Sequence, residues 1–172
     1  IIHEGVVTIG DSAFNNNLEG LRQLKTVILP STLEIIGNNA FYNASALTVL
    51  ELPAGLKEIG YGAFQGCTAL VLVCPDNLRL ESIGENAFRN CSSLTSIKLA
   101  SSLKWLGDGA FYDCASLRAL YVPASATLQD EFVSTSAYLL HGCTSMKVLS
   151  IGGPSEPVIY HDMFSYKMLY ND

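Results

Sequence analysis

A six-residue pattern that returns at nearly regular intervals is the strongest constraint on how this chain can fold. The pattern first occurs as IGDSAF at Ile9, and the copies IGNNAF, IGYGAF, IGENAF and LGDGAF follow it along the 172 residues. Its phenylalanines stand 27, 23, 24 and 23 residues apart, at Phe14, Phe41, Phe64, Phe88 and Phe111. Repetition at such a period is typical of units that stack on one another, whereas a reactive site needs its residues only once. We therefore interpret the pattern as structural.

The whole unit, LxxIxLPxxLxxIGxxAFxxC, predicts one short strand followed by turns. Its first part alternates apolar and polar residues, which is typical of a strand with one buried face. A proline such as Pro53 or Pro123 ends that strand because proline has no N–H to donate. The glycine of the IG step suits a tight bend with positive φ. We expect the ring of the Ala-Phe pair to stack on the rings of neighbouring coils.

This unit resembles the BspA-like, or TpLRR, class of leucine-rich repeats, which is known from bacterial and some protist surface proteins. The resemblance extends from about Ile2 to Ile151. It implies a right-handed, curved solenoid of about six to seven repeats of roughly 23 residues, with a short parallel β-sheet on the concave face and turns and short helical segments elsewhere. It also implies a secreted or cell-surface protein that mediates adhesion or host interaction.

The repeats predict a single domain over residues 1–172, with repeat units over about 2–151. Residues 124–139 lack the IGxxAF pattern and are interpreted as an irregular insertion, and residues 152–172 as a degenerate last coil or cap. Pro75 comes one residue early, which predicts an irregular strand end. Because the chain starts in the middle of a unit and without Met, we expect a piece of a longer protein whose signal region is not visible. No stretch approaches the roughly 18 apolar residues of a membrane span.

The cysteines occupy one position of the repeat. Three residues after the phenylalanine or its equivalent stand Cys67, Cys91, Cys114 and Cys143, and an earlier unit has Ala44 there. A position that accepts alanine favours small, buried, reduced thiols. The CxxC and HxxxH spacings of metal sites do not occur, so we expect no metal. Disulfides between stacked coils are the alternative left open.

Catalytic chemistry finds little support in the sequence. The three histidines lie in different coils, and His141 beside Cys143 is the one conceivable thiol–base pair. Its position is filled by Gln65 or Arg89 in other units, which is typical of solvated surface. We therefore predict no catalytic residue, no cofactor and no enzyme activity.

Charge narrows the classes of partner. The formal net charge is −6 and the ten basic residues are scattered, which disfavours nucleic acids and anionic membranes. Asn43 and Asn90 begin N-x-S sequons, which are glycan acceptors in a eukaryotic secretory setting and plain turn asparagines otherwise.

We expect the chain to recognise a protein or glycan ligand, including one derived from a host, through the concave sheet. The candidate binding positions alternate with the buried strand positions and are Thr26, Ile28, Val49, Glu51, Leu72, Ser96, Lys98, Ala119, Tyr121, Val148 and Ser150. About half of such positions are apolar, which favours binding. Tyr121 and Lys98 are the leading candidates for contact residues. The alternative is a passive spacer that projects other domains of a longer surface protein.

Overall fold

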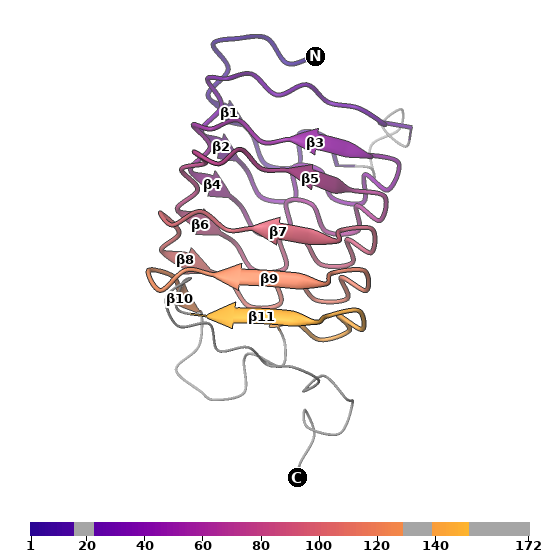
Figure 1. Ribbon diagram of the computed structural model, residues 1–172. Coiled ribbons are helices and arrows are strands. Elements are labelled where there is room, and N and C mark those ends of the chain that lie inside the picture. The colour runs from indigo at the N-terminus through magenta and orange to yellow at the C-terminus, as the bar shows by residue number, and fades with distance from the viewer. Residues whose placement is uncertain (16–22, 129–138, 152–172) are drawn as a thin grey trace.

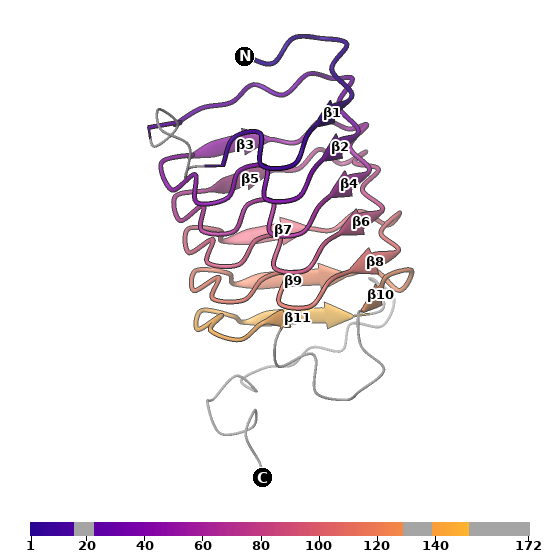
Figure 2. The ribbon, with the colours of Figure 1, turned by 180° about the vertical axis from the view of Figure 1, so that it is seen from behind.

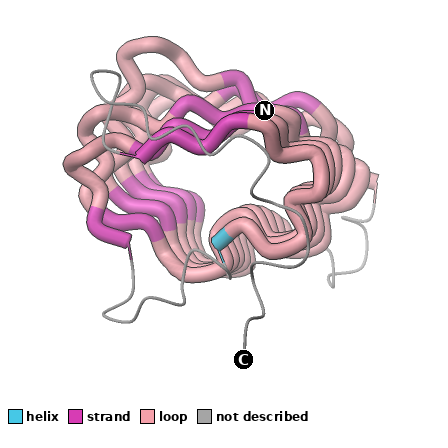
Figure 3. Tube along the Cα trace, turned by 60° about the horizontal axis from the view of Figure 1, so that its bottom comes forward, coloured by secondary structure: helices cyan, strands magenta, loops and turns pink. Residues whose placement is uncertain are grey.

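The structure is a computed structural model that describes residues 1–15, 23–128 and 139–151. In these ranges the chain is a β-solenoid whose coils stack along one axis (Figure 1). Seen down the stack, successive coils superimpose on a common outline (Figure 3). The predicted insertion at 124–139 lies largely outside the described residues, and the predicted cap at 152–172 lies wholly outside them.

The coils contribute strands to two rows on different sides of the solenoid (Figures 1 and 2). The first row is a parallel sheet of six strands, in spatial order β1 (Thr8–Ile9), β2 (Ile35–Ile36), β4 (Glu58–Ile59), β6 (Ser82–Ile83), β8 (Trp105–Leu106) and β10 (Thr127–Leu128). The second row is divided into two parallel sheets, β3 (Val49–Glu51) with β5 (Val71–Val73), and β7 (Ser96–Lys98), β9 (Ala119–Val122) and β11 (Val148–Ile151).

The six-stranded sheet was not predicted, because the sequence pattern had indicated strands only in the second row. Five of its strands end on the apolar residue of an IG step, whereas β10 ends on Leu128, where the pattern is missing. The register brings Ile36, Ile59, Ile83 and Leu106 into one row. These four side chains are at most 1% exposed. The six strands come one from each coil and are separated by five turns of the solenoid; the six to seven repeats that were expected include segments outside the described residues.

A column of stacked phenyl rings runs through the hydrophobic core, as predicted. Neighbouring rings are stacked from Phe14 to Phe111, with centroids 5.1, 5.2, 5.4 and 5.5 Å apart. The Phe64 N–H donates to the Ala87 carbonyl of the next coil at 2.8 Å, and the same bond recurs along the column. The Ala-Phe pair therefore joins each coil to the next through both the backbone and the ring.

The IG glycines are required for a different reason from the one expected. Gly37, Gly60, Gly84 and Gly107 do not have positive φ. A Cβ on Gly60 would lie 2.8 Å from the Asn38 nitrogen of the preceding coil, and its counterparts would meet the same obstacle. Glycine is needed because the backbones of successive coils approach closely, not because the bend is left-handed.

Left-handed residues instead form two other columns. One stands two residues after the IG glycine and consists of Ser12, Asn39, Gly62, Asn86 and Gly109. The other stands two residues after the phenylalanine or its equivalent and consists of Asn43, Gly66, Asn90, Asp113 and Gly142. Glycine and asparagine adopt this conformation most readily, which explains the recurrence of Asn and Gly at both positions.

The second row is interrupted between β5 and β7, which do not pair. The interruption coincides with the early Pro75, so the irregularity seen in the sequence is confirmed at this strand end. In β5 the register places Leu72 opposite the buried Leu50, and Val71 and Val73 opposite the exposed Val49 and Glu51.

Candidate functional site

The outward surface of the second row, here called the strand face, carries most of the predicted binding residues. It comprises β3, β5, β7, β9, β11 and the preceding segment 26–28. Ala119 and Val148 are half-buried on it. The predicted residues that are exposed on this face are Thr26, Ile28, Val49, Glu51, Ser96, Lys98 and Tyr121.

Two predicted binding residues are buried, and the prediction of their exposure was wrong. Leu72 is 9% exposed because the strand is one residue shorter here, and a shift of one residue moves every side chain to the opposite face. Val71 and Val73 take its place at the surface; counting residues between Leu70 and Pro75 could have indicated this. Ser150 is in register with Tyr121, as expected, but it is only 3% exposed.

Exposed aliphatic side chains gather at the N-terminal end of the strand face. Val49 pairs with Val71 and Glu51 with Val73 across β3 and β5. Val49, Val71 and Val73 are 55%, 39% and 45% exposed, and Ile28 in the preceding coil is 59% exposed. We call these four residues the aliphatic patch. Exposed apolar residues on neighbouring coils are less usual at a solvent surface than single scattered ones, and such a concentration often marks an interaction site.

In the coils of β7 and β9 the strand face carries a charged and an aromatic side chain instead of aliphatic ones. Lys98 is in register with Tyr121, and its ammonium group lies 3.0 Å from the carboxylate of Asp76 across the interruption in the row. Both charged side chains are highly exposed, so this ion pair contributes little to stability. Tyr121 is 52% exposed. An aromatic ring with a polar tip therefore stands beside a solvent-accessible charge.

The cysteines form a buried ladder of reduced thiols. All five are free, so the disulfide alternative is not realised. The Sγ of Cys67, Cys91, Cys114 and Cys143 donates to a phenylalanine carbonyl of the preceding coil at 3.1–3.2 Å. Burial raises the pKa of Cys67 and of Cys143 to about 12, and also raises the pKa of Cys91 and of Cys114. These thiols stay protonated near neutral pH, which is the opposite of an activated nucleophile.

His141 stacks on Tyr112, with ring centroids 4.6 Å apart. The guanidinium of Arg89 lies 4.3 Å from the centroid of the same ring. Cys143, meanwhile, donates to the Phe111 carbonyl. The conceivable thiol–base pair is therefore not formed in this structure, and His141 is instead part of a short surface stack.

Metal-binding clusters and membrane-spanning helices are both absent from residues 1–15, 23–128 and 139–151. Within them, no group of three or more His, Cys, Asp or Glu residues is placed to hold a metal ion. In the same ranges, no helix has the length and apolar character to cross a bilayer.

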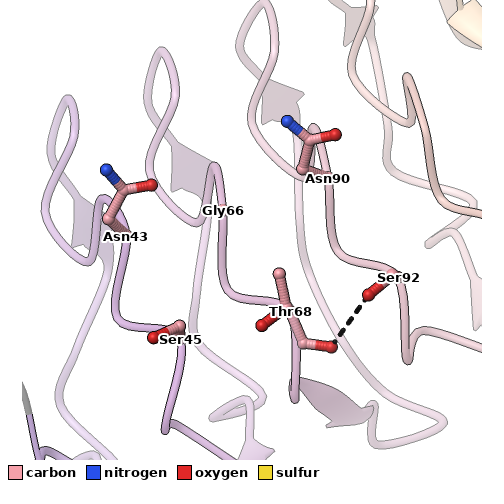
Figure 4. A pocket seen from close by; sticks show the side chains of 6 residues that line it. All are labelled: Asn43, Ser45, Gly66, Thr68, Asn90 and Ser92. Carbon is pink, nitrogen blue, oxygen red and sulfur yellow. Dashed lines mark hydrogen bonds between the residues drawn. The ribbon is translucent and has the colours of Figure 1, made fainter.

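A shallow polar groove of about 500 Å³ lies at the turns that lead into β3, β5 and β7 (Figure 4). It is lined by Asn43, Ser45, Gly66, Thr68, Asn90 and Ser92. These are the first and third residues of the two sequons and of the equivalent segment between them. The sequence showed the sequons, but only the stacking of the coils shows that the three segments form one surface.

The repeats match a known family over nearly the whole chain. Residues 1–78 and 72–171 match the family described as BspA type leucine-rich repeat region (6 copies). The chain belongs to the BspA-type leucine-rich repeat family. Curated protein sequences gave no match.

Solved structures share the fold of this BspA-type chain. A leucine-rich repeat protein from Bacteroides ovatus is 33% identical, with a TM-score of 0.67 over 85% of this chain and 35% of that one. The T. pallidum leucine-rich repeat protein TpLRR is 29% identical, with a TM-score of 0.64 over 73% and 57% of the two chains. A leucine rich cell surface protein from Faecalibacterium prausnitzii is 23% identical, with a TM-score of 0.62 over 94% and 48%. The chain thus spans less than two thirds of each of these proteins.

Proposed function

We propose that this BspA-type chain is a non-enzymatic recognition module that binds a protein partner through the strand face. The proposal rests on one observation, the distribution of the exposed large apolar side chains. Five of the nine such residues in the described part of the chain, Ile28, Val49, Val71, Val73 and Tyr121, are on this face. Aromatic and apolar residues that become desolvated contribute most of the energy in protein interfaces, and Tyr is enriched among the residues that matter most.

The arrangement favours a protein ligand over a nucleic acid or a membrane surface. The aliphatic patch gives an apolar contact, and Lys98 with Asp76 gives both signs of charge beside it. A partner with an apolar segment flanked by polar residues would complement this face. The formal net charge of −6 opposes binding to a polyanion.

We place the protein outside the cell or on its surface. The support comes from the family and from the Faecalibacterium structure, which is described as a leucine rich cell surface protein. In that location the module would contribute to adhesion, and its ligand would come from the matrix or from a host cell. The competing function is a passive spacer, in which the apolar residues merely cover the sheet.

The proposal is tested by measuring binding of the wild-type chain to immobilised extracellular-matrix proteins by surface plasmon resonance. Two variants alter the strand face, Tyr121→Ala and the double variant Val49→Ser/Val71→Ser. Trp105→Ala is the matched control, because Trp105 is also an exposed aromatic residue, at 40%, but belongs to the six-stranded sheet. Circular dichroism verifies that each variant keeps its fold.

We expect Tyr121→Ala to weaken binding at least about tenfold, the effect of losing a contact worth about 1.4 kcal/mol. Trp105→Ala should leave the affinity within about twofold. Loss of binding in Trp105→Ala with none in Tyr121→Ala would refute the assignment to the strand face. A wild-type chain that binds none of the immobilised proteins would favour the spacer.

A further inference from the structure

The polar groove is separate from the strand face and is not used by the proposed function. It crosses three consecutive coils, and the Phe rings of those coils are 5.2 and 5.4 Å apart. Each coil presents the same two positions to it, a left-handed residue and, two residues later, a hydroxyl group. Figure 4 shows the side chains of Asn43 and Asn90 directed to the same side of the turns.

Several polar groups in the groove are left available by the protein. In the described residues, the side chains of Asn90, Ser45 and Thr68 make no hydrogen bond to another residue. The hydroxyl of Ser92 donates to the Thr68 carbonyl at 3.2 Å, so its oxygen can still accept. The side-chain oxygen of Asn43 occupies the space where a Cβ on Gly66 would lie, so the amide of Asn43 covers this glycine.

The lining excludes several classes of ligand. It contains no charged side chain, so it has nothing to pair with a phosphate, a carboxylate or an ammonium group. The adjacent Arg89 is held over the Tyr112 ring. The groove also lacks the large apolar side chains that bind lipids or drug-like molecules. What it offers is a neutral set of amide and hydroxyl donors and acceptors, repeated from coil to coil.

We infer that the groove binds a neutral glycan chain that runs along the solenoid axis. The hydroxyl groups of sugars are both donors and acceptors, which matches amides and hydroxyls without requiring charge. The spacing of the coils is comparable with the length of one sugar residue in an extended glycan, so successive residues meet equivalent groups. Because the groove is shallow, the affinity is low for one chain and increases when many copies of the protein meet a polysaccharide surface.

The test uses isothermal titration calorimetry with neutral hexasaccharides of glucose, mannose and N-acetylglucosamine, and with a charged oligogalacturonate for comparison. Asn90→Gly removes the amide without straining the turn, since Gly66 and Gly142 already hold the equivalent left-handed position. Thr68→Val removes a hydroxyl at nearly constant volume. Asn86→Gly is the matched control, because Asn86 is also left-handed but does not line the groove.

We expect at least one neutral hexasaccharide to bind at millimolar concentration. Asn90→Gly and Thr68→Val should each raise its Kd about 3–10-fold, the effect of one lost hydrogen bond. Asn86→Gly and Tyr121→Ala should leave the Kd unchanged. The inference is overturned if no neutral hexasaccharide binds, if the charged oligosaccharide binds more tightly, or if Asn86→Gly weakens binding as much as Asn90→Gly does. An intact mass that shows a glycan attached to Asn43 or Asn90 would also overturn it, by making the sequons acceptors.

Discussion

The backbone nitrogen of Tyr61 lies so close to Gly84 that a Cβ on Gly84 would be 2.6 Å from it. The carbonyl carbon of Gly60 would be 2.7 Å away. Both atoms belong to the backbone of the preceding coil, so no side-chain rotation can relieve the contact. The distance between coils, rather than the local bend, therefore requires glycine at the IG step.

Gly84→Ala should lower the free energy of unfolding by about 2–3 kcal/mol, because it overpacks a backbone contact. Gly10 holds the same position of the repeat in the first coil, but a Cβ there would meet nothing within 4 Å. Gly10→Ala should change stability by less than about 0.5 kcal/mol. Urea unfolding of the two variants checks this, and equal effects would contradict the role assigned to coil spacing.

Phe64→Ala should cost about 3–5 kcal/mol, since the ring is fully buried and stacked on both sides. Gln65→Ala, which changes the adjacent half-buried residue, should have little effect. The comparison is made by thermal unfolding followed by circular dichroism. An unchanged Tm for Phe64→Ala would mean that the phenyl column does not support the fold.

Leu72→Ala should destabilise the protein by about 2–5 kcal/mol, because Leu72 is a buried residue of β5. Val73→Ala should cost less than about 0.5 kcal/mol, since Val73 is 45% exposed. Chemical unfolding of both variants distinguishes the observed register of β5 from the one that regular alternation predicts, in which Leu72 is exposed. If Val73→Ala were the more damaging change, the register of β5 with β3 would be wrong.

The phenyl column, the small residues beside it and the buried thiols could be predicted from the sequence because each depends on a period that five units repeat. The phase of Leu72 was missed because one residue is absent between Leu70 and Pro75, which reverses the alternation. The short interval is the trace of this change in the sequence, and pairing with Leu50 shows which side is buried. The six-stranded sheet was missed because its strands are two residues long, too short to show a period of their own.

The candidate sites also differ in whether one repeat unit is enough to predict them or the stacking of several coils is needed. Tyr121 and Lys98 could be placed at the surface because they follow the regular alternation of their coils. The groove between Asn43 and Asn90 required the stacking, since these residues are far apart in sequence and meet across an intervening coil. The IG glycine is required by the close approach of two coils, which one repeat unit alone does not show. The single unit therefore suggested positive φ instead.

Thiol titration with a disulfide reagent at pH 8 should show slow reaction in the native protein and five thiols after unfolding without reductant. Cys74 should react first, because it is only partly buried while the four ladder thiols are at most 4% exposed. Burial raises the pKa of Cys74 as well, which slows that reaction relative to a free thiol. Rapid native reaction of several thiols would contradict the buried ladder.

Stability should fall as the pH rises above about 9. The ordinary thiol pKa is 9.0, and in the folded protein the pKa of Cys67 is raised to about 12. Between these values the unfolded chain has lost the proton that the folded chain keeps, so thiolate formation favours unfolding. Unfolding in urea at pH 7.5 and pH 10 measures the loss. The loss of stability should be smaller in Cys67→Ala. Alanine is suited to this position, because Ala44 fills it in another coil. An equal loss in the variant and in the wild type would exclude the Cys67 thiol as a cause.

The interruption between β5 and β7 has a mechanical consequence. In the part of the chain that the structure describes, each strand pairs with strands of adjacent coils, so a force applied along the axis passes through the coil boundaries in series. At this boundary the second row has no strand pairing, and the load falls on the six-stranded sheet, on the stack of Phe64 with Phe88 and on backbone hydrogen bonds such as that from the Phe64 N–H to the Ala87 carbonyl. Under tension this boundary should part before the boundaries on either side of it, where β3 pairs with β5 and β7 pairs with β9.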